Sequence, residues 1–131
     1  MRIWLARLLI GLVFLFNVQC ALVFLLSPAG YASGFELAGA LGEAMLRALG
    51  LLFLMWNVPY AVALWNPGRY RISLYEAVVM QAIGLVGETW IYLNLSSIHI
   101  IARSSLSRFI IFDGFGLILL LTAVWVVRKI R

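Results

Sequence analysis

The chain has 131 residues, of which 65% are hydrophobic and 11% are charged, and its formal net charge is +5. A soluble globular domain carries about 25% charged residues, so this composition excludes an ordinary water-soluble fold. The apolar segments do not alternate in polarity as the strands of a membrane barrel do, which leaves helices to satisfy the backbone in lipid. We therefore expect an all-α integral membrane protein.

Four apolar segments occupy most of the chain, at residues 3–26, 45–65, 74–95 and 109–127. A hydrocarbon core near 30 Å needs about 20 helical residues, and each segment reaches or approaches that length. Because the linkers are short, we predict one domain over residues 1–131, an antiparallel up-down four-helix bundle. Its helices should cover approximately residues 3–26, 34–65, 73–95 and 108–128, with residues 45–65 of the second helix in the membrane.

The basic residues lie at the ends of the predicted helices. If the N-terminus is cytoplasmic, the side chains on the cytoplasmic face include Arg2, Arg7, Arg69, Arg71, Arg128, Lys129 and Arg131. The positive-inside rule then favours both termini in the cytoplasm, in a multi-pass protein of a bacterial inner (plasma) membrane. This explains the positive charge by topology and by contact with anionic membrane lipids, so we expect no nucleic-acid partner.

Serine, proline and glycine mark the helix boundaries. Residues 27–30 (Ser-Pro-Ala-Gly) should end the first helix. Residues 33–36 and 73–76 each have the Ser-x-x-Glu form of a capping box, which explains Glu36 and Glu76 structurally. A second helix that begins at Gly34 is longer than the bilayer is thick, so its first turns should project from the outer face or form a separate short helix.

Three single residues carry further expectations. Pro59 should kink the second helix, and Asn57 can satisfy part of the freed backbone. Cys20 is the sole cysteine, which excludes an intramolecular disulfide. His99, in a polar linker over residues 96–107, is the sole histidine, so a multi-histidine metal site is excluded. We expect neither a metal nor a cofactor.

Polar side chains inside the predicted spans are the candidates for a site. An ionisable side chain near the bilayer centre costs about 2.5–3.5 kcal/mol and usually faces a partner or a wet cavity. In the predicted topology, five polar residues map to the outer half of the bilayer: Asn17, Gln19, Arg47, Glu88 and Asp113. The candidate cluster comprises six residues, Asn17, Glu43, Arg47, Gln81, Glu88 and Asp113. We expect a polar cluster there that opens outward, either a ligand-binding site or a purely structural network in which Arg47 bridges Glu88 and Asp113.

Helical spacing refines this cluster. Glu43 and Arg47 are four residues apart and can pair, and Gln81, Gly84 and Glu88 share one face of the third helix. One arginine cannot neutralise three carboxylates, so one of the carboxyl groups could hold a proton. Asn17 and Gln19 point to opposite sides of the first helix, so one of them at most faces the cluster fully.

Two short motifs resemble the DoxX-like group of small four-helix bacterial membrane proteins. The first is Arg47-Ala48-Leu49-Gly50-Leu51-Leu52 at the opening of a span, and the second is Gly84-Leu85-Val86-Gly87-Glu88. Members are often membrane proteins of unknown function, and some are linked to quinone or sulfur redox complexes. The resemblance implies the four-helix layout, and it transfers no set of redox residues to this chain.

Three functions remain open. The favoured one is a membrane protein that binds a hydrophobic or lipid-like molecule, or an accessory subunit of a membrane complex, because no catalytic set is evident. The second is a proton-coupled small-molecule transporter. The third is an intramembrane lipid-modifying enzyme, isomerase-like, with Glu88 and Asp113 as acid and base. A homo-oligomer is compatible with all three.

Overall fold

The computed structural model describes residues 1–129, and Arg131, one of the basic residues assigned to the cytoplasmic face, lies outside them. In chain order the elements are α1 Arg2–Leu26, α2 Ala29–Ala32, the 3-10 turn η1 Ser33–Phe35, α3 Gly39–Trp56, α4 Val58–Trp65, α5 Arg71–Asn94 and α6 Ile100–Arg128. The described residues contain no β-strand, which confirms the all-α prediction.

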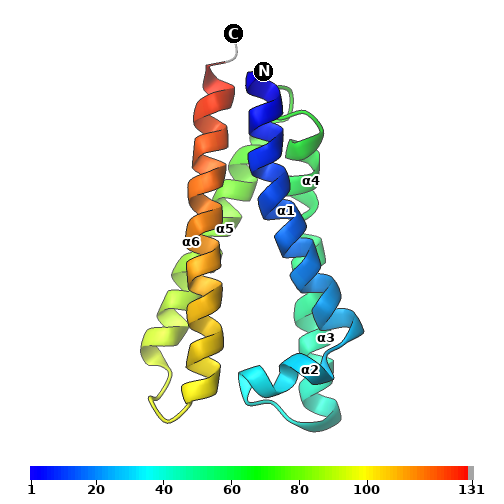
Figure 1. The fold of residues 1–131 in the computed structure, drawn as a ribbon, viewed down its shortest axis with the longest axis vertical. Helices are drawn as coiled ribbons and strands as arrows, with labels where there is room; N and C mark the ends of the chain where they lie inside the picture. The colour runs from blue at the N-terminus through cyan, green and yellow to red at the C-terminus, as the bar shows by residue number, and fades with distance from the viewer. Residues whose placement is uncertain (130–131) are drawn as a thin grey trace.

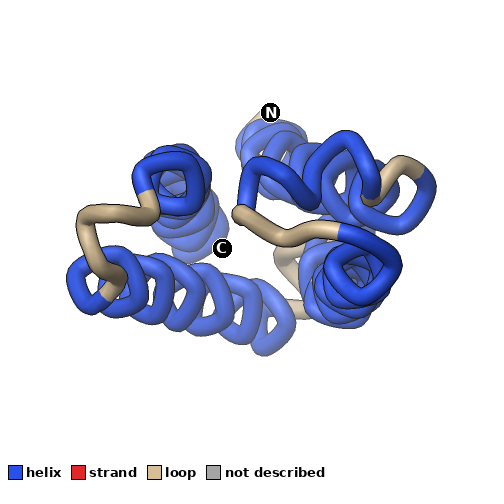
Figure 2. The backbone as a smooth tube through the Cα atoms, turned by 90° about the horizontal axis from the view of Figure 1, so that it is seen from below, coloured by secondary structure: helices blue, strands red, loops and turns tan. Residues whose placement is uncertain are grey.

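The long helices run back and forth along one axis (Figure 1). The start of α1 and the end of α6 lie together at one end, where Arg2 Nη1 donates a hydrogen bond of 2.8 Å to the carbonyl oxygen of Lys129. We call this the terminal end. The short α2 and η1 cross the opposite end, as the view along the axis also shows (Figure 2), and we call it the capped end.

Packing is tightest toward the terminal end. There α1 packs against α4 and α6, and α5 packs against α4 and α6. The alanines between these helices are fully buried (Ala6, Ala63, Ala77 and Ala123), beside Ile10, Tyr60 and Leu120. Small residues let helix backbones approach closely in a membrane, where packing rather than water exclusion holds helices together. Toward the capped end the pair α5–α6 separates from the pair α1–α3 (Figure 1).

Within residues 1–129, three helical stretches are long and apolar enough to cross a membrane: Arg2–Leu26, Gly39–Trp65 and Ile100–Arg128. Their outward faces carry exposed large apolar side chains, such as Leu8, Leu15 and Ile118. The chain is therefore a helical membrane-type protein. The segment at 74–95, which we predicted to be a span, forms α5 but is not among these three stretches.

The second predicted helix does not begin at residue 34. Residues 29–35 form the separate elements α2 and η1, and α3 begins at Gly39. Neither expected capping box forms, since no side chain caps η1, α3 or α5 and Ser73 lies inside α5. The reason at the first position is tertiary, because the Glu36 side chain contacts His99 and the backbone N–H of Ala102 instead.

The fourth helix also differs from the prediction, because α6 begins at Ile100 rather than at 108. Two sets of contacts order this added part. Arg103 Nη1 donates to the carbonyl oxygens of Tyr92 and Leu95, at 2.8 and 2.6 Å. Ser105 Oγ donates to the carbonyl oxygen of Gly34 at 2.5 Å, which ties α6 to η1. A segment that we expected to be a surface linker is thus the first part of a long helix.

The helix that contains Pro59 is interrupted where the proline predicted a kink. α3 ends at Trp56, α4 begins at Val58, and Asn57 lies between them. Asn57 Nδ2 donates a hydrogen bond of 2.6 Å to the carbonyl oxygen of Phe53. The Phe53 carbonyl also accepts from the backbone N–H of Asn57, whereas Pro59 removes the helical bond to the carbonyl of Met55, so this side-chain bond does not replace the one that the proline removes.

Candidate functional site

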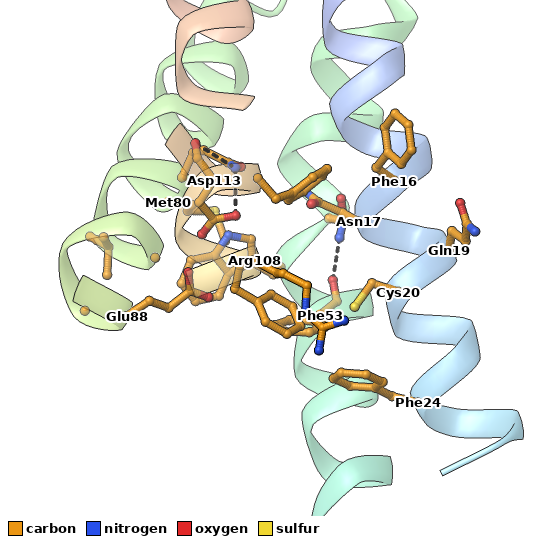
Figure 3. Close-up of a pocket in the computed structure, with 18 of the residues that line it drawn as sticks. Phe16, Asn17, Gln19, Cys20, Phe24, Phe53, Met80, Glu88, Arg108 and Asp113 are labelled. Carbon is orange, nitrogen blue, oxygen red and sulfur yellow. Dashed lines mark hydrogen bonds between the residues drawn. The ribbon is translucent and has the colours of Figure 1, made fainter. Parts of the chain in front are cut away.

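A cavity of about 650 Å³ lies between the two diverging helix pairs, toward the capped end. Residues of α1, α3, α5 and α6 line it, and Tyr31 of α2 reaches it from the cap. α3 does not pack closely against α5 or α6, so the space between these helices stays open. Figure 3 shows Cys20 and Asn17 on one side and Glu88 and Asp113 on the other.

Aromatic rings form the part of the cavity nearest the cap. Phe24 is buried at its centre and contacts four other rings, those of Tyr31, Phe35, Phe53 and Phe109, at centroid distances of 5.8–6.2 Å. Four of the five rings line the cavity, with Tyr31 as the contribution of α2, and the ring of Phe35 from η1 contacts Phe24 and Phe109. An apolar surface of this kind accommodates hydrocarbon rather than a polar solute.

A chain of hydrogen bonds closes the other end of the cavity. Tyr60 Oη donates to Gln81 Oε1 at 2.6 Å, and Gln81 Nε2 donates to Asp113 Oδ1 at 3.0 Å. Tyr60 and Gln81 are buried, at 0% and 2% exposure. The chain fixes α4, α5 and α6 to one another, and it holds the Asp113 carboxyl group in place at the cavity wall.

Two glycines allow this close arrangement. A Cβ atom at Gly84 would lie 2.5 Å from Asp113 Oδ2, and one at Gly116 would lie 2.7 Å from Gln81 Nε2. Asp113 therefore packs over the Gly84 backbone of α5, and Gln81 over the Gly116 backbone of α6. Gly87, one turn further along α5, lines the cavity and has nothing within 4 Å of its Cβ position.

Four of the six predicted site residues line this cavity together: Asn17, Gln81, Glu88 and Asp113. Gln19 also lines it, but it is exposed and points away from the acids in Figure 3, whereas Asn17 points toward them. This agrees with the opposite directions expected for two residues so spaced on one helix.

The other two predicted residues, Glu43 and Arg47, do not line the cavity. Within residues 1–129, the ion pair of Arg47 is with Glu43, at 3.5 Å, as their spacing predicted, and not with Glu88 or Asp113, as the alternative of a structural network required. The physical reason is helix rotation: Leu46 and Gly50 of α3 are buried, Gly50 against α1, and the next position along a helix turns about 100° away from that face. The prediction that Arg47 bridges Glu88 and Asp113 is therefore wrong.

Among the described residues, the cation that lines the cavity is Arg108, at the first position of the predicted fourth helix and not among the six predicted site residues. Its Nη2 donates to Ser105 Oγ at 3.2 Å. A helical stripe could have revealed it, because residues 105, 108, 109, 112, 113 and 116 follow the spacing of one helix face. Within the predicted helix 108–128 the stripe already contains residue 108, and the extension of α6 back to Ile100 adds residue 105.

Two buried acceptor oxygens at the cavity have no hydrogen-bond partner in the described structure. They are Glu88 Oε2 and Asn57 Oδ1. Asn57 is only 3% exposed, and its amide nitrogen is already bonded to Phe53. Within residues 1–129, no three His, Cys, Asp or Glu side chains come together as a metal site would require.

Comparison with known proteins gives no family model, no curated protein and no solved structure that matches this chain. The site must therefore be interpreted from its own geometry.

Proposed function

We propose that this chain is an integral membrane protein that binds a hydrophobic or lipid-like molecule in the cavity between α1, α3, α5 and α6, alone or as an accessory subunit of a membrane complex. The observation that carries the proposal is the cavity itself. Its volume of about 650 Å³ lies within the ~300–1,000 Å³ of ordinary ligand pockets. Like them, it combines an apolar and aromatic lining with a few polar groups.

The proposal includes α5 as a fourth span of an up-down bundle with both termini cytoplasmic. One face of α5 supports this, because five large apolar side chains outside the cavity are exposed along it: Ile72, Val79, Val86, Trp90 and Leu93. Their spacing of three, four or seven residues defines a single helical stripe, as expected for a lipid-facing surface. In this orientation the capped end and the cavity lie toward the outer side of a bacterial inner membrane.

Gly87 offers a direct test of ligand binding. A leucine there would extend into the cavity without a clash at its Cβ, so Gly87→Leu should remove bound lipid while the fold is kept. Gly30→Leu is the matched control, because Gly30 also has open space around it but lies in α2 outside the cavity. Arg47→Gln is a second control, since Arg47 does not line the cavity.

The measurement is native mass spectrometry of protein released from mild detergent. We expect a lipid-like adduct on the native chain, on Gly30→Leu and on Arg47→Gln, and its loss on Gly87→Leu. Equal adducts on all four proteins, or none on the native chain, would overturn the proposal.

The transport and enzyme hypotheses both need Glu88 and Asp113 at one cavity, and both residues line it. Proton flux into liposomes that is lost in Glu88→Gln would favour the transport hypothesis over our proposal. Chemical conversion of the co-purified lipid that is lost in Glu88→Gln and Asp113→Asn would favour the enzyme hypothesis. Binding without flux or conversion supports our proposal.

A further inference from the structure

The cavity wall presents two oxygens that can accept hydrogen bonds and receive none. Glu88 Oε2 lies on α5, and Asn57 Oδ1 lies at the break between α3 and α4, and both atoms are buried. More than nine in ten buried polar groups of proteins have a partner, so two unpaired acceptors at one cavity call for an explanation. An occupant of the cavity would supply one.

The assignment of these atoms as acceptors follows from their neighbours. The carbonyl oxygen of Phe53 can only accept, so the atom of Asn57 bonded to it must be the NH₂ group. The oxygen of that amide is then the free atom. Glu88 lies within hydrogen-bond reach of Asp113, so one carboxyl group of the pair can donate a proton to the other. In either case Glu88 keeps at least one acceptor oxygen.

Two other polar side chains of the wall have partners inside the protein. Gln81 spans Tyr60 and Asp113, and the Arg108 guanidinium bonds Ser105. Both buried atoms without a partner are acceptors, so they call for hydrogen-bond donors from an occupant, in a lining that is otherwise largely apolar and aromatic.

We infer that the ligand of this cavity is a long-chain amphiphile whose head group donates hydrogen bonds, and that Glu88 and Asn57 accept them. This inference rests on the proposed lipid-binding function and specifies its ligand class. Hydroxyl groups and an ammonium group share this donor chemistry. A lipid that carries neither, such as phosphatidylcholine, leaves both oxygens unpaired.

The test uses the full chain in phosphatidylcholine nanodiscs, because that lipid has no head-group donor. Three radiolabelled probes have equal chains: hexadecane-1,2-diol, its dimethyl ether, and hexadecylammonium. Saturable binding is defined as the difference between the native chain and Gly87→Leu, in which the cavity is filled. The ether keeps the chain and the oxygens of the diol and replaces its two donor hydrogens by methyl groups.

We expect the diol to bind about tenfold more tightly than the dimethyl ether, because the ether leaves buried acceptors unpaired. Glu88→Leu and Asn57→Leu should each reduce that advantage by about threefold or more. Glu88→Gln retains an acceptor oxygen and loses the charge, so it should keep the preference for the diol. If Glu88→Gln loses hexadecylammonium binding, the head group that Glu88 accepts from is a charged ammonium. If that binding is unchanged, the donor is a neutral hydroxyl group. Either result supports the inference, provided that the native chain binds the diol more tightly than the ether.

Equal affinity of diol and ether for the native chain would overturn the inference and leave lipid binding intact. It would mean that ordered water satisfies the two oxygens. This comparison needs no variant at Asn57 or Glu88, so poor folding of those variants cannot hide it. Absence of saturable binding for every probe would instead overturn the proposed function.

Discussion

Gln81 Nε2 donates a hydrogen bond of 3.0 Å to Asp113 Oδ1 and so joins α5 to α6 at the inner end of the cavity. The other end of the same amide accepts from Tyr60 Oη, which brings in α4. A single buried side chain therefore connects three consecutive helices. It also keeps one carboxyl group of the cavity bonded, while Glu88 retains an unpaired oxygen.

Replacing Gln81 should destabilise the fold. Gln81→Leu leaves the Tyr60 hydroxyl and the Asp113 carboxyl group without their shared partner in a buried place, which costs about 1–3 kcal/mol. SDS-induced unfolding in mixed micelles measures the free energy of unfolding. Gln19→Leu is the control, because Gln19 is exposed and should change stability by less than about 0.5 kcal/mol. Equal effects of the two substitutions would contradict a structural role for the Gln81 bridge.

Two neighbouring glycines of α5 should respond in opposite ways to the same methyl group. Gly84→Ala places a Cβ 2.5 Å from Asp113 Oδ2, so either Asp113 or the helix must move, at about 1–3 kcal/mol. Gly87→Ala meets nothing within 4 Å, and higher helix propensity should stabilise it by up to about 1 kcal/mol. Thermal unfolding in one detergent compares them. A destabilised Gly87→Ala beside a neutral Gly84→Ala would show that the α5–α6 contact is misplaced.

Gly50 should be the most sensitive position between α1 and α3. A Cβ there would lie 2.8 Å from the carbonyl oxygen of Ala21 and 2.9 Å from Leu25 Cγ. Since the nearest atom belongs to the backbone, Gly50→Ala should force the helices apart and destabilise the protein by about 1–3 kcal/mol. Gly114→Ala, whose nearest contact is at 3.9 Å, is the control. Unfolding in micelles checks the difference, and similar midpoints for both variants would refute it.

The contact between the cap and α6 should weaken in acid. The hydrogen bond with His99 lowers the pKa of Glu36 from its ordinary 4.5, and the Ala102 N–H acts in the same direction. A lowered pKa means that the ionised carboxylate stabilises the contact. The stabilisation is complete above pH 4.5 and disappears as the pH falls through the lowered value.

Spin labels at Ser33 and Ser107 can follow this contact by electron paramagnetic resonance. The distance between them should stay constant at neutral pH and broaden at acid pH. In Glu36→Gln, which cannot ionise, the distribution should be broad at neutral pH and insensitive to acid. A native chain without any pH dependence would show that Glu36 does not hold the cap.

The expected site was partly accessible to sequence reasoning because burial in a membrane makes polar residues conspicuous. Asn17, Gln81, Glu88 and Asp113 stand out in apolar segments, and they line one cavity. Arg47 stands out equally, yet its position on α3 turns it toward Glu43. Depth along a helix can be counted from the sequence, whereas rotation depends on which face a neighbouring helix covers.

By itself the sequence determined that the chain is helical and of membrane type, because long apolar segments leave the backbone no other way to form its hydrogen bonds. Only the tertiary structure decided where α6 begins, how α2 and η1 fold across the capped end, and that Arg108 rather than Arg47 lines the cavity. Contacts between segments far apart in the chain, such as Ser105 with Gly34 and Glu36 with His99, set these features. Such contacts overrule local capping signals, because each places a polar side chain where only the assembled helices offer it a partner.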